Sequence, residues 1–143
     1  MKSNDKLSDN FTKKEFMCKC GCNSLIHINF KLLIGLEKLR TLINKPIHIN
    51  SGYRCKNHHS EIKKSKTGQH TLGNAADIKL PEGMSMKQFH DAVLTIEEFK
   101  GIGIPTNSNY IHVDCRTNPA KWGYSINQKE ISYDKALDIL GWK

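Results

Sequence analysis

Long runs of apolar residues are missing from this sequence. Hydrophobic residues make up 38% of the 143 positions, and no uninterrupted stretch approaches the ~20 residues that a transmembrane helix needs. The start of the chain, from Met1 to Lys6, is polar, and the apolar segment of a secretory signal peptide does not follow it. We therefore expect a soluble protein with no membrane span and no signal peptide, made in the cytoplasm.

Acidic residues are also scarce. The chain has 14 Asp and Glu against 22 Lys and Arg, which gives a net charge of +8. An excess of this size suggests an anionic partner, such as nucleic acid, anionic lipid or the acidic polymers of a bacterial envelope. The sequence lacks a recognition helix dense in Lys and Arg, and it lacks a repeated pattern of aromatic and basic residues. Nucleic acid is therefore not the expected partner.

The five cysteines cannot all pair, because a sixth would be needed. Cys18, Cys20 and Cys22 lie within five positions. They could hold a second, structural metal ion, with or without Cys55, they could form a disulfide with each other or with Cys55, or they could stay reduced. A protein made in a reducing compartment argues against obligatory disulfides, and the spacing matches no standard paired Cys-x-x-Cys zinc site. We therefore favour reduced thiols over the other two.

Two segments far apart in the sequence carry candidate metal ligands. The first segment is residues 68–78, in which His70 lies on a glycine-flanked loop. Asp77 follows seven positions later, in a run of residues typical of a buried strand. Strict alternation in residues 110–114 predicts a second strand, which carries His112. Two nitrogens and one oxygen that leave a fourth position for water are typical of a catalytic zinc site. Taken alone, this spacing also suits a solvated or capping histidine.

The wider pattern resembles the zinc D-Ala-D-Ala carboxypeptidase family, and in particular its branch of small bacterial carboxypeptidases and phage lysins. The resemblance covers about residues 11–124. It rests on five segments that recur in the family's order: Ser51-Gly52-Tyr53-Arg54, then His70 with Thr71, Gly73, Ala75 and Asp77-Ile78, then Gly101-Ile102-Gly103, then His112-Val113-Asp114, and finally Ala120-Lys121-Trp122.

This resemblance implies a peptidoglycan hydrolase. One catalytic zinc ion, bound by His70, Asp77 and His112, would activate water to attack an amide carbonyl in peptidoglycan stem peptides, as a carboxypeptidase or as an endolysin-like endopeptidase. The family match assigns to Arg54 the binding of a substrate carboxylate or carbonyl, which suits its planar guanidinium. Tyr53 beside it is a further predicted substrate contact. Such an enzyme would act on the cell wall after release by another route, as in a phage or a virus.

Arg116 is the third predicted substrate contact. It continues the side of the strand that carries His112 and Asp114, and its charge suits an anionic substrate. We expect these groups to gather on the same face because side chains two positions apart along a strand point to the same side.

The sequence departs from the family at the general base. Dipeptidases and several phage endopeptidases of this superfamily carry Glu or Asp three residues before the second histidine ligand, where this chain has Asn109. An amide cannot accept the proton of water. Asp114 is the candidate base, since it shares the face of His112. Asp114 could instead accept the free ring N–H of a ligand histidine and fix its tautomer. The missing acid also leaves an alternative function, a zinc-retaining, non-catalytic cell-wall or protein-binding module.

The expected architecture is an α+β domain with a small, mainly antiparallel sheet and helices packed on one face, similar to the fold shared by these peptidases and the Hedgehog signalling domain. We expect a disordered N-terminus at residues 1–10, the zinc-peptidase-like domain at residues 11–124, and a helical extension packed on it at residues 125–143. No linker or internal repeat divides the chain, so one domain is expected. We also expect a monomer. Hydrophobic periodicity predicts helices at residues 30–43, 85–96 and 132–140, and strands at 46–50, 75–80, 101–105 and 110–114.

Overall fold

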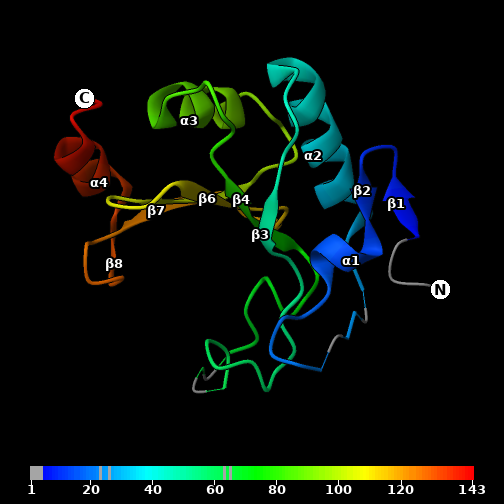
Figure 1. The fold of residues 1–143 in the computed structure, drawn as a ribbon. Helices are drawn as coiled ribbons and strands as arrows, with labels where there is room; N and C mark the ends of the chain where they lie inside the picture. Colours follow the sequence, from blue (N-terminus) through cyan, green and yellow to red (C-terminus); the bar gives the residue numbers. More distant parts are fainter. Residues whose placement is uncertain (1–4, 23, 26, 63, 65) are drawn as a thin grey trace.

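A six-stranded sheet runs through the computed structural model (Figure 1), which describes residues 5–22, 24–25, 27–62, 64 and 66–143. The strand order is β3-β4-β6-β5-β7-β8, and every neighbouring pair is antiparallel except β5 and β7. The predicted α+β class with a mainly antiparallel sheet is confirmed. The strands are β3 (Ile49–Ser51), β4 (Ala75–Lys79), β5 (Gly101–Pro105), β6 (Tyr110–Asp114), β7 (Ala120–Tyr124) and β8 (Glu130–Ser132).

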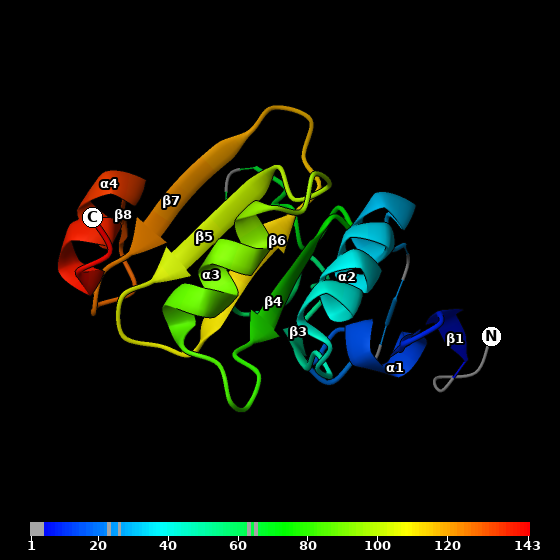
Figure 2. The same ribbon diagram turned by 90° about the horizontal axis from the view of Figure 1, so that it is seen from above.

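Two helices, α2 (Phe30–Ile43) and α3 (Met86–Leu94), lie over one face of the sheet (Figures 1 and 2). Asn29 caps the start of α2 by accepting a hydrogen bond from Lys31 N, and Asn44 ends the helix in the left-handed conformation. Burial of their apolar sides against the sheet forms the core, which includes Leu32, Leu36, Ile78, Phe89, Val93 and Ile111. The helices thus cover one face of the sheet and leave the opposite face for the loops.

The N-terminal part is more ordered than the sequence predicts. Strand β1 (Lys6–Ser8) pairs with β2 (Phe11–Thr12), and helix α1 (Lys13–Phe16) follows. Glu37 on α2 accepts hydrogen bonds from the Ser8 hydroxyl and from the backbone and side-chain nitrogens of Asn10. The prediction of disorder over residues 1–10 is therefore wrong for this strand, because a contact distant in the sequence holds it. Residues 1–4 lie outside the described residues.

The C-terminal part forms β8 and then helix α4 (Tyr133–Leu140). Ser132 caps α4, and Ala136 is buried against β7, where Gly123 leaves room for its methyl group. We did not predict strands β7 and β8 from the sequence. Among the described residues, no helix has the length and hydropathy needed to cross a membrane.

Candidate metal centre

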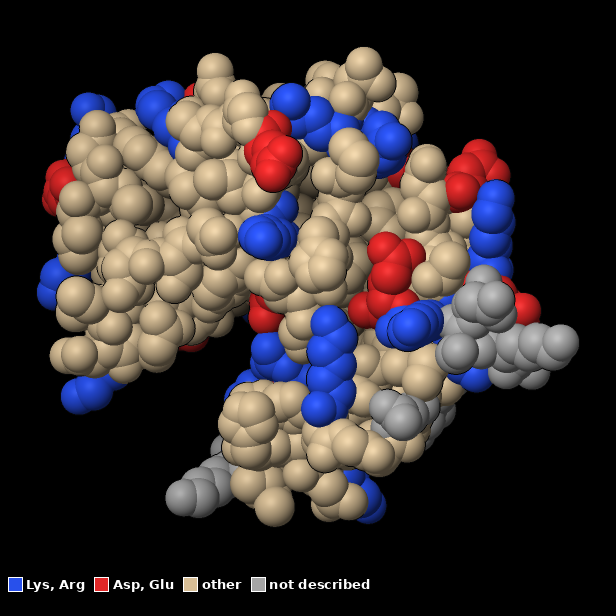
Figure 3. Space-filling model, viewed as in Figure 1, with Lys and Arg blue, Asp and Glu red and all other residues tan. Residues whose placement is uncertain are grey.

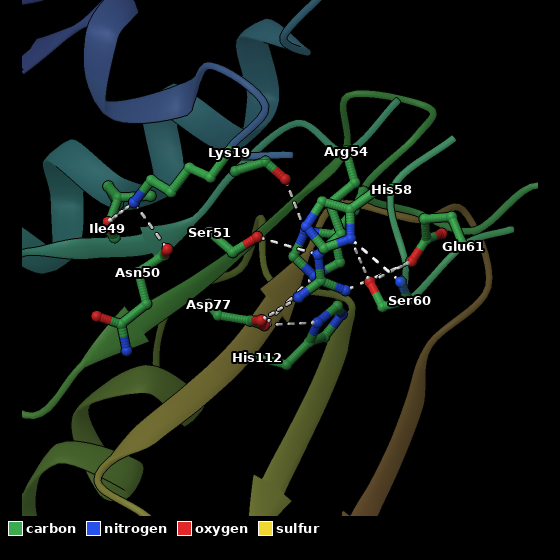
Figure 4. A network of polar contacts seen from close by, with 12 residues as sticks. Lys19, Ile49, Asn50, Ser51, Arg54, His58, Ser60, Glu61, Asp77 and His112 are labelled. Atoms are coloured by element: carbon green, nitrogen blue, oxygen red, sulfur yellow. Dashed lines mark hydrogen bonds and ion pairs between the residues drawn. The ribbon is translucent and has the colours of Figure 1, made fainter. Parts of the chain in front are cut away.

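The pairing of β4 with β6 brings two of the predicted ligands together. Asp77 lies directly opposite His112 in this antiparallel pair, so both side chains point to the same face of the sheet. The loop before β4 adds His70 to the same place. Asp77 Oδ1 lies 3.3 Å from His70 Nε2 and 3.1 Å from His112 Nδ1, and all three residues are buried. Figure 4 shows Asp77 and His112 pointing towards each other from neighbouring strands.

The outer nitrogen of each imidazole ring already has a partner. His70 Nδ1 donates to the carbonyl oxygen of Gly52 at 2.7 Å, and His112 Nε2 donates to Asp114 Oδ2 at 2.7 Å. In a neutral imidazole only one nitrogen carries a proton. In the neutral rings, the inner nitrogens, His70 Nε2 and His112 Nδ1, are therefore lone-pair acceptors that face a carboxylate oxygen. Three acceptors pointing at one another need a shared cation, which is either a metal ion or a proton on one of the rings. Burial lowers the pKa of His112, but its hydrogen bonds with Asp114 and Asp77 raise it above its usual value, so this ring is the one that takes up such a proton.

The spacing of these acceptors fits a tetrahedral ion. Bonds of ~2.0–2.2 Å from zinc to nitrogen and oxygen place neighbouring ligand atoms ~3.3–3.6 Å apart, close to the 3.1 and 3.3 Å seen around Asp77 Oδ1. Burial lowers the pKa of His70, so its ring stays neutral and keeps its lone pair near pH 7. His70, Asp77 and His112 could thus hold a metal ion, and three protein ligands leave a fourth position open.

Arg54 holds the second oxygen of Asp77. Its Nη2 donates to Asp77 Oδ2 at 2.9 Å, while its Nε donates to Ser51 Oγ at 3.0 Å and its Nη1 lies 3.5 Å from Glu61 Oε2. Burial raises the pKa of Asp77, but in the metal-free protein a proton on the inner nitrogen of His112 or His70 donates to the carboxylate, and this outweighs burial and holds that pKa well below its usual range. The predicted substrate contact Arg54 therefore contacts the candidate metal ligand Asp77 in the structure, as Figure 4 shows.

Asp114 lies on the outer side of His112. Its side chain is fully buried, and Arg116 binds both carboxylate oxygens, with Nε at 2.8 Å from Oδ1 and Nη2 at 2.7 Å from Oδ2. Burial raises the pKa of Asp114, but the hydrogen bonds from Arg116 and His112 lower it by more than burial raises it. The pKa therefore lies below its usual value, and the carboxylate is ionised. The imidazole ring stands between this carboxylate and Asp77. Of the two roles left open by the sequence, the geometry supports positioning of His112 rather than general-base catalysis.

Residues 9–114 match the family model of peptidase M15. The chain belongs to the peptidase M15 family. This confirms the resemblance drawn from the sequence at the level of the family, whose members are zinc-dependent metallopeptidases. A comparison with curated protein sequences finds no match. The matched region includes His70, Asp77 and His112, and it ends before β7 begins.

The candidate metal centre of this M15 family member lies at the wall of a cavity of about 560 Å³. Arg54, Lys64 and Arg116 line the cavity, whereas Asp77 is the one carboxylate among its described lining residues. Figure 3 shows a hollow between the body of the molecule and the lobe of loops below it, with Lys and Arg side chains beside the hollow. The cavity therefore carries an excess of positive charge. Asn109, the position of the missing acid, is exposed and does not line it.

Tyr53, a predicted substrate contact, does not line the cavity. Its side chain is buried, its backbone N–H donates to the carbonyl oxygen of Phe16 at 2.8 Å, and it is not among the residues that line the cavity. The assignment of Tyr53 to substrate binding is therefore not supported by its place in the fold. The carbonyl oxygen of its neighbour Gly52 accepts the hydrogen bond of His70 Nδ1. The backbone of this segment therefore contacts a candidate ligand, whereas the tyrosine side chain does not line the cavity.

Three aromatic residues of the cavity wall were not predicted as site residues. Tyr110 precedes His112 by two positions on β6, and Trp122 and Tyr124 alternate along β7. The ring of Trp122 lies 5.2 Å from that of His112, and the guanidinium of Arg116 stacks on the indole at 4.7 Å from its centre. The two-residue alternation with His112 was a usable signal for Tyr110. Nothing in the sequence showed that β7 would pair with β5.

Proposed function

We propose that this M15 peptidase hydrolyses amide bonds in peptidoglycan stem peptides with a zinc ion bound by His70, Asp77 and His112. The observation that carries the proposal is the convergence of three lone-pair atoms within 4.8 Å of one another, at the wall of an open, positively charged cavity. Each outer polar atom of the three side chains has its own partner. Such support is what a preorganised metal site needs.

When bound, Zn²⁺ would act as a Lewis acid and lower the pKa of a bound water to about 7. The protein residues hold the ligands and the substrate. Gly52 and Asp114 fix the tautomers of the two histidines, and Arg54 orients Asp77 by a hydrogen bond to its Oδ2 atom. Burial raises the pKa of Tyr110 to about 12. Its hydroxyl therefore stays protonated at neutral pH and can donate a hydrogen bond to a substrate carbonyl.

Arg116 is the proposed contact for a substrate carboxylate. Its Nε and Nη2 atoms donate to Asp114, and Nη1 takes part in neither bond, so a donor of the guanidinium is left for a ligand. Arg54, in contrast, uses all three of its nitrogens on protein oxygens. Stem peptides contain D-amino acids and free carboxylates, which suits a cationic cavity.

The test is digestion of purified cell-wall sacculi, followed by loss of turbidity and by release of free amines. The wild type should release amines, a chelator should stop the release, and added zinc should restore it. Asp77→Asn should release none, while Asp134→Asn, an exposed substitution on α4, should behave as the wild type. Release that persists in the chelated, zinc-free protein would overturn the proposal.

A second candidate function is a zinc-retaining module that binds the cell wall without cutting it. It is favoured by one observation: Asp77 is the single carboxylate among the described residues of the cavity wall, so a separate acid for general-base catalysis is absent from that set. The same sacculi distinguish the two functions. A binding module would sediment with sacculi and release no amines at any pH.

A further inference from the structure

Four cysteine side chains meet on the side of the molecule where α1 and β3 end. Cys18, Cys20 and Cys22 follow α1, and Cys55 comes four residues after β3. The sulfur of Cys55 lies 3.6 Å from that of Cys18, 3.5 Å from that of Cys20 and 3.8 Å from that of Cys22. All four sulfurs lie within 4.8 Å of one another, and all four thiols are free.

These separations are those of a tetrahedral metal site. Four sulfurs bound to zinc at ~2.3 Å form a tetrahedron whose edges measure about 3.8 Å. A disulfide would join two sulfurs at about 2.05 Å and use only one pair, which gives no reason for the other two thiols to approach. One metal ion bound by all four sulfurs explains why three thiols surround the fourth at nearly equal distances.

The backbone around the cluster turns all four sulfurs inward. Gly21 has a φ of +108°, a conformation that residues with a Cβ rarely adopt, and this turn directs Cys20 and Cys22 to the same point. Cys18 N donates to Ser24 O at 2.8 Å and closes the loop. Cys55 N donates to the sulfur of Cys18 at 3.4 Å. Backbone N–H groups that donate to sulfur are common around metal-bound thiolates.

We propose that Cys18, Cys20, Cys22 and Cys55 bind one structural zinc ion, separate from the peptidase centre. Four thiolates complete a tetrahedral coordination shell, and a closed shell is typical of a structural site. Soft sulfur ligands in this geometry select zinc or iron over the harder cations, and zinc is redox-inert. Cys20 and Cys22 are exposed, so the ion can enter from solvent.

The proposed ion would hold the segment that supports the peptidase centre. Gly52 accepts the hydrogen bond of His70, and Arg54 binds Asp77. Cys55 is the next residue after Arg54, so a bond from its sulfur to the ion fixes the end of this segment. Lys19, between two of the cysteines, donates to the carbonyl oxygens of Ile49 and Asn50 (Figure 4), which ties the cysteine loop to β3. The ion thus stabilises the positions of two peptidase ligands through their partners.

The first test is the zinc content of the full chain, purified under reducing conditions. The wild type should contain two zinc ions per chain, and Cys22→Ser should contain one. Cys115→Ser is the matched control, because Cys115 is the one cysteine outside the cluster, and it should keep two. His112→Ala should lose the other ion and keep the one bound by the cysteines. Circular dichroism confirms that each variant is folded.

The second test identifies the ligands without relying on a variant. Cobalt-substituted wild type should show the sulfur-to-cobalt charge-transfer absorption and the intense visible bands of a tetrahedral thiolate site. Cys115→Ser should keep them, and Cys22→Ser should weaken or shift them. One zinc ion per chain with five titratable thiols, a disulfide within the cluster, or iron in place of zinc would each overturn the proposal. An inactive protein with two zinc ions would contradict only the proposed peptidase function.

Discussion

Asp114 accepts the hydrogen bond of His112 Nε2 at 2.7 Å, on the edge of the imidazole ring that faces away from Asp77. The ring is thereby held with Nδ1 towards the other two ligands. Arg116 binds both oxygens of Asp114, and burial of the carboxylate keeps water from competing for these bonds. The orientation of one metal ligand thus depends on a residue that does not reach the proposed ion.

Asp114→Asn should weaken metal binding. The amide has nearly the same shape, but it carries no charge to pair with Arg116 and to raise the basicity of His112. Loss of such an outer partner costs about 10–100-fold in metal affinity. Competition against a chelator measures this, with Asp134→Asn on the surface as the control. Unchanged affinity together with abolished hydrolysis would instead identify Asp114 as the general base.

Arg54→Gln should also lower metal affinity, because Asp77 would lose the partner of its Oδ2 atom. We expect a loss of about tenfold or more, as for other outer partners of metal ligands. Arg40→Gln is a suitable control, since Arg40 lies on α2 and does not line the cavity. If Arg54 mainly reads the substrate carboxylate, the variant would keep its metal affinity and show a raised KM.

Gly101→Ala should disturb the metal centre from a distance. Gly101 on β5 pairs with Asp114 on β6, and a methyl group there would overlap the Asp114 carboxylate. Overpacking of this kind costs about 1–3 kcal/mol of stability, and metal affinity should fall with it. Val93→Ala, a core substitution on α3, should lower stability and leave metal affinity unchanged. Urea unfolding and chelator competition separate the two effects.

His90 should make the protein less stable in weak acid. His90 is buried on α3 against the rings of Tyr133 and Trp142, and its Nδ1 lies 3.1 Å from Asp91 Oδ1. Burial lowers the pKa of His90, and the charges of Lys87 and Lys121 lower it as well. The native state then binds fewer protons than the unfolded state, whose histidine titrates near pH 6.5.

The free energy of unfolding should therefore fall as the pH drops below about 6.5, with up to about 1.4 kcal/mol per pH unit from this residue. His90→Gln should remove that part of the slope. Urea unfolding of both proteins between pH 5 and pH 7 compares the slopes at the same metal concentration. Equal slopes would show that His90 does not bind its proton more weakly in the folded state.

The convergence of the three candidate metal ligands was predictable because the signal in each segment is local. Alternation along β6 and the apolar run of β4 put His112 and Asp77 on strands, and the family pattern joined them to His70. The boundaries of α2 were predictable for the same reason, since Asn29 and Asn44 cap it through contacts within the helix.

What the sequence did not reveal depends on contacts between distant segments. Strand β1 is polar, and it is held by Glu37, which lies more than twenty positions away. The family match assigned Arg54 to the substrate, and nothing in the order of residues shows that Asp77 lies beside it. Cys55 likewise meets the cysteines after α1 because of the direction that the chain takes after the end of β3.

The position of the metal ion is the most direct test of this account. Crystals of the zinc-replete protein, measured at the zinc absorption edge, would locate each ion by its anomalous scattering. We predict a peak bonded to His70 Nε2, Asp77 Oδ1 and His112 Nδ1, with a solvent molecule as the fourth ligand. No peak between these three side chains, or a fourth ligand from the protein, would contradict a hydrolytic metal centre.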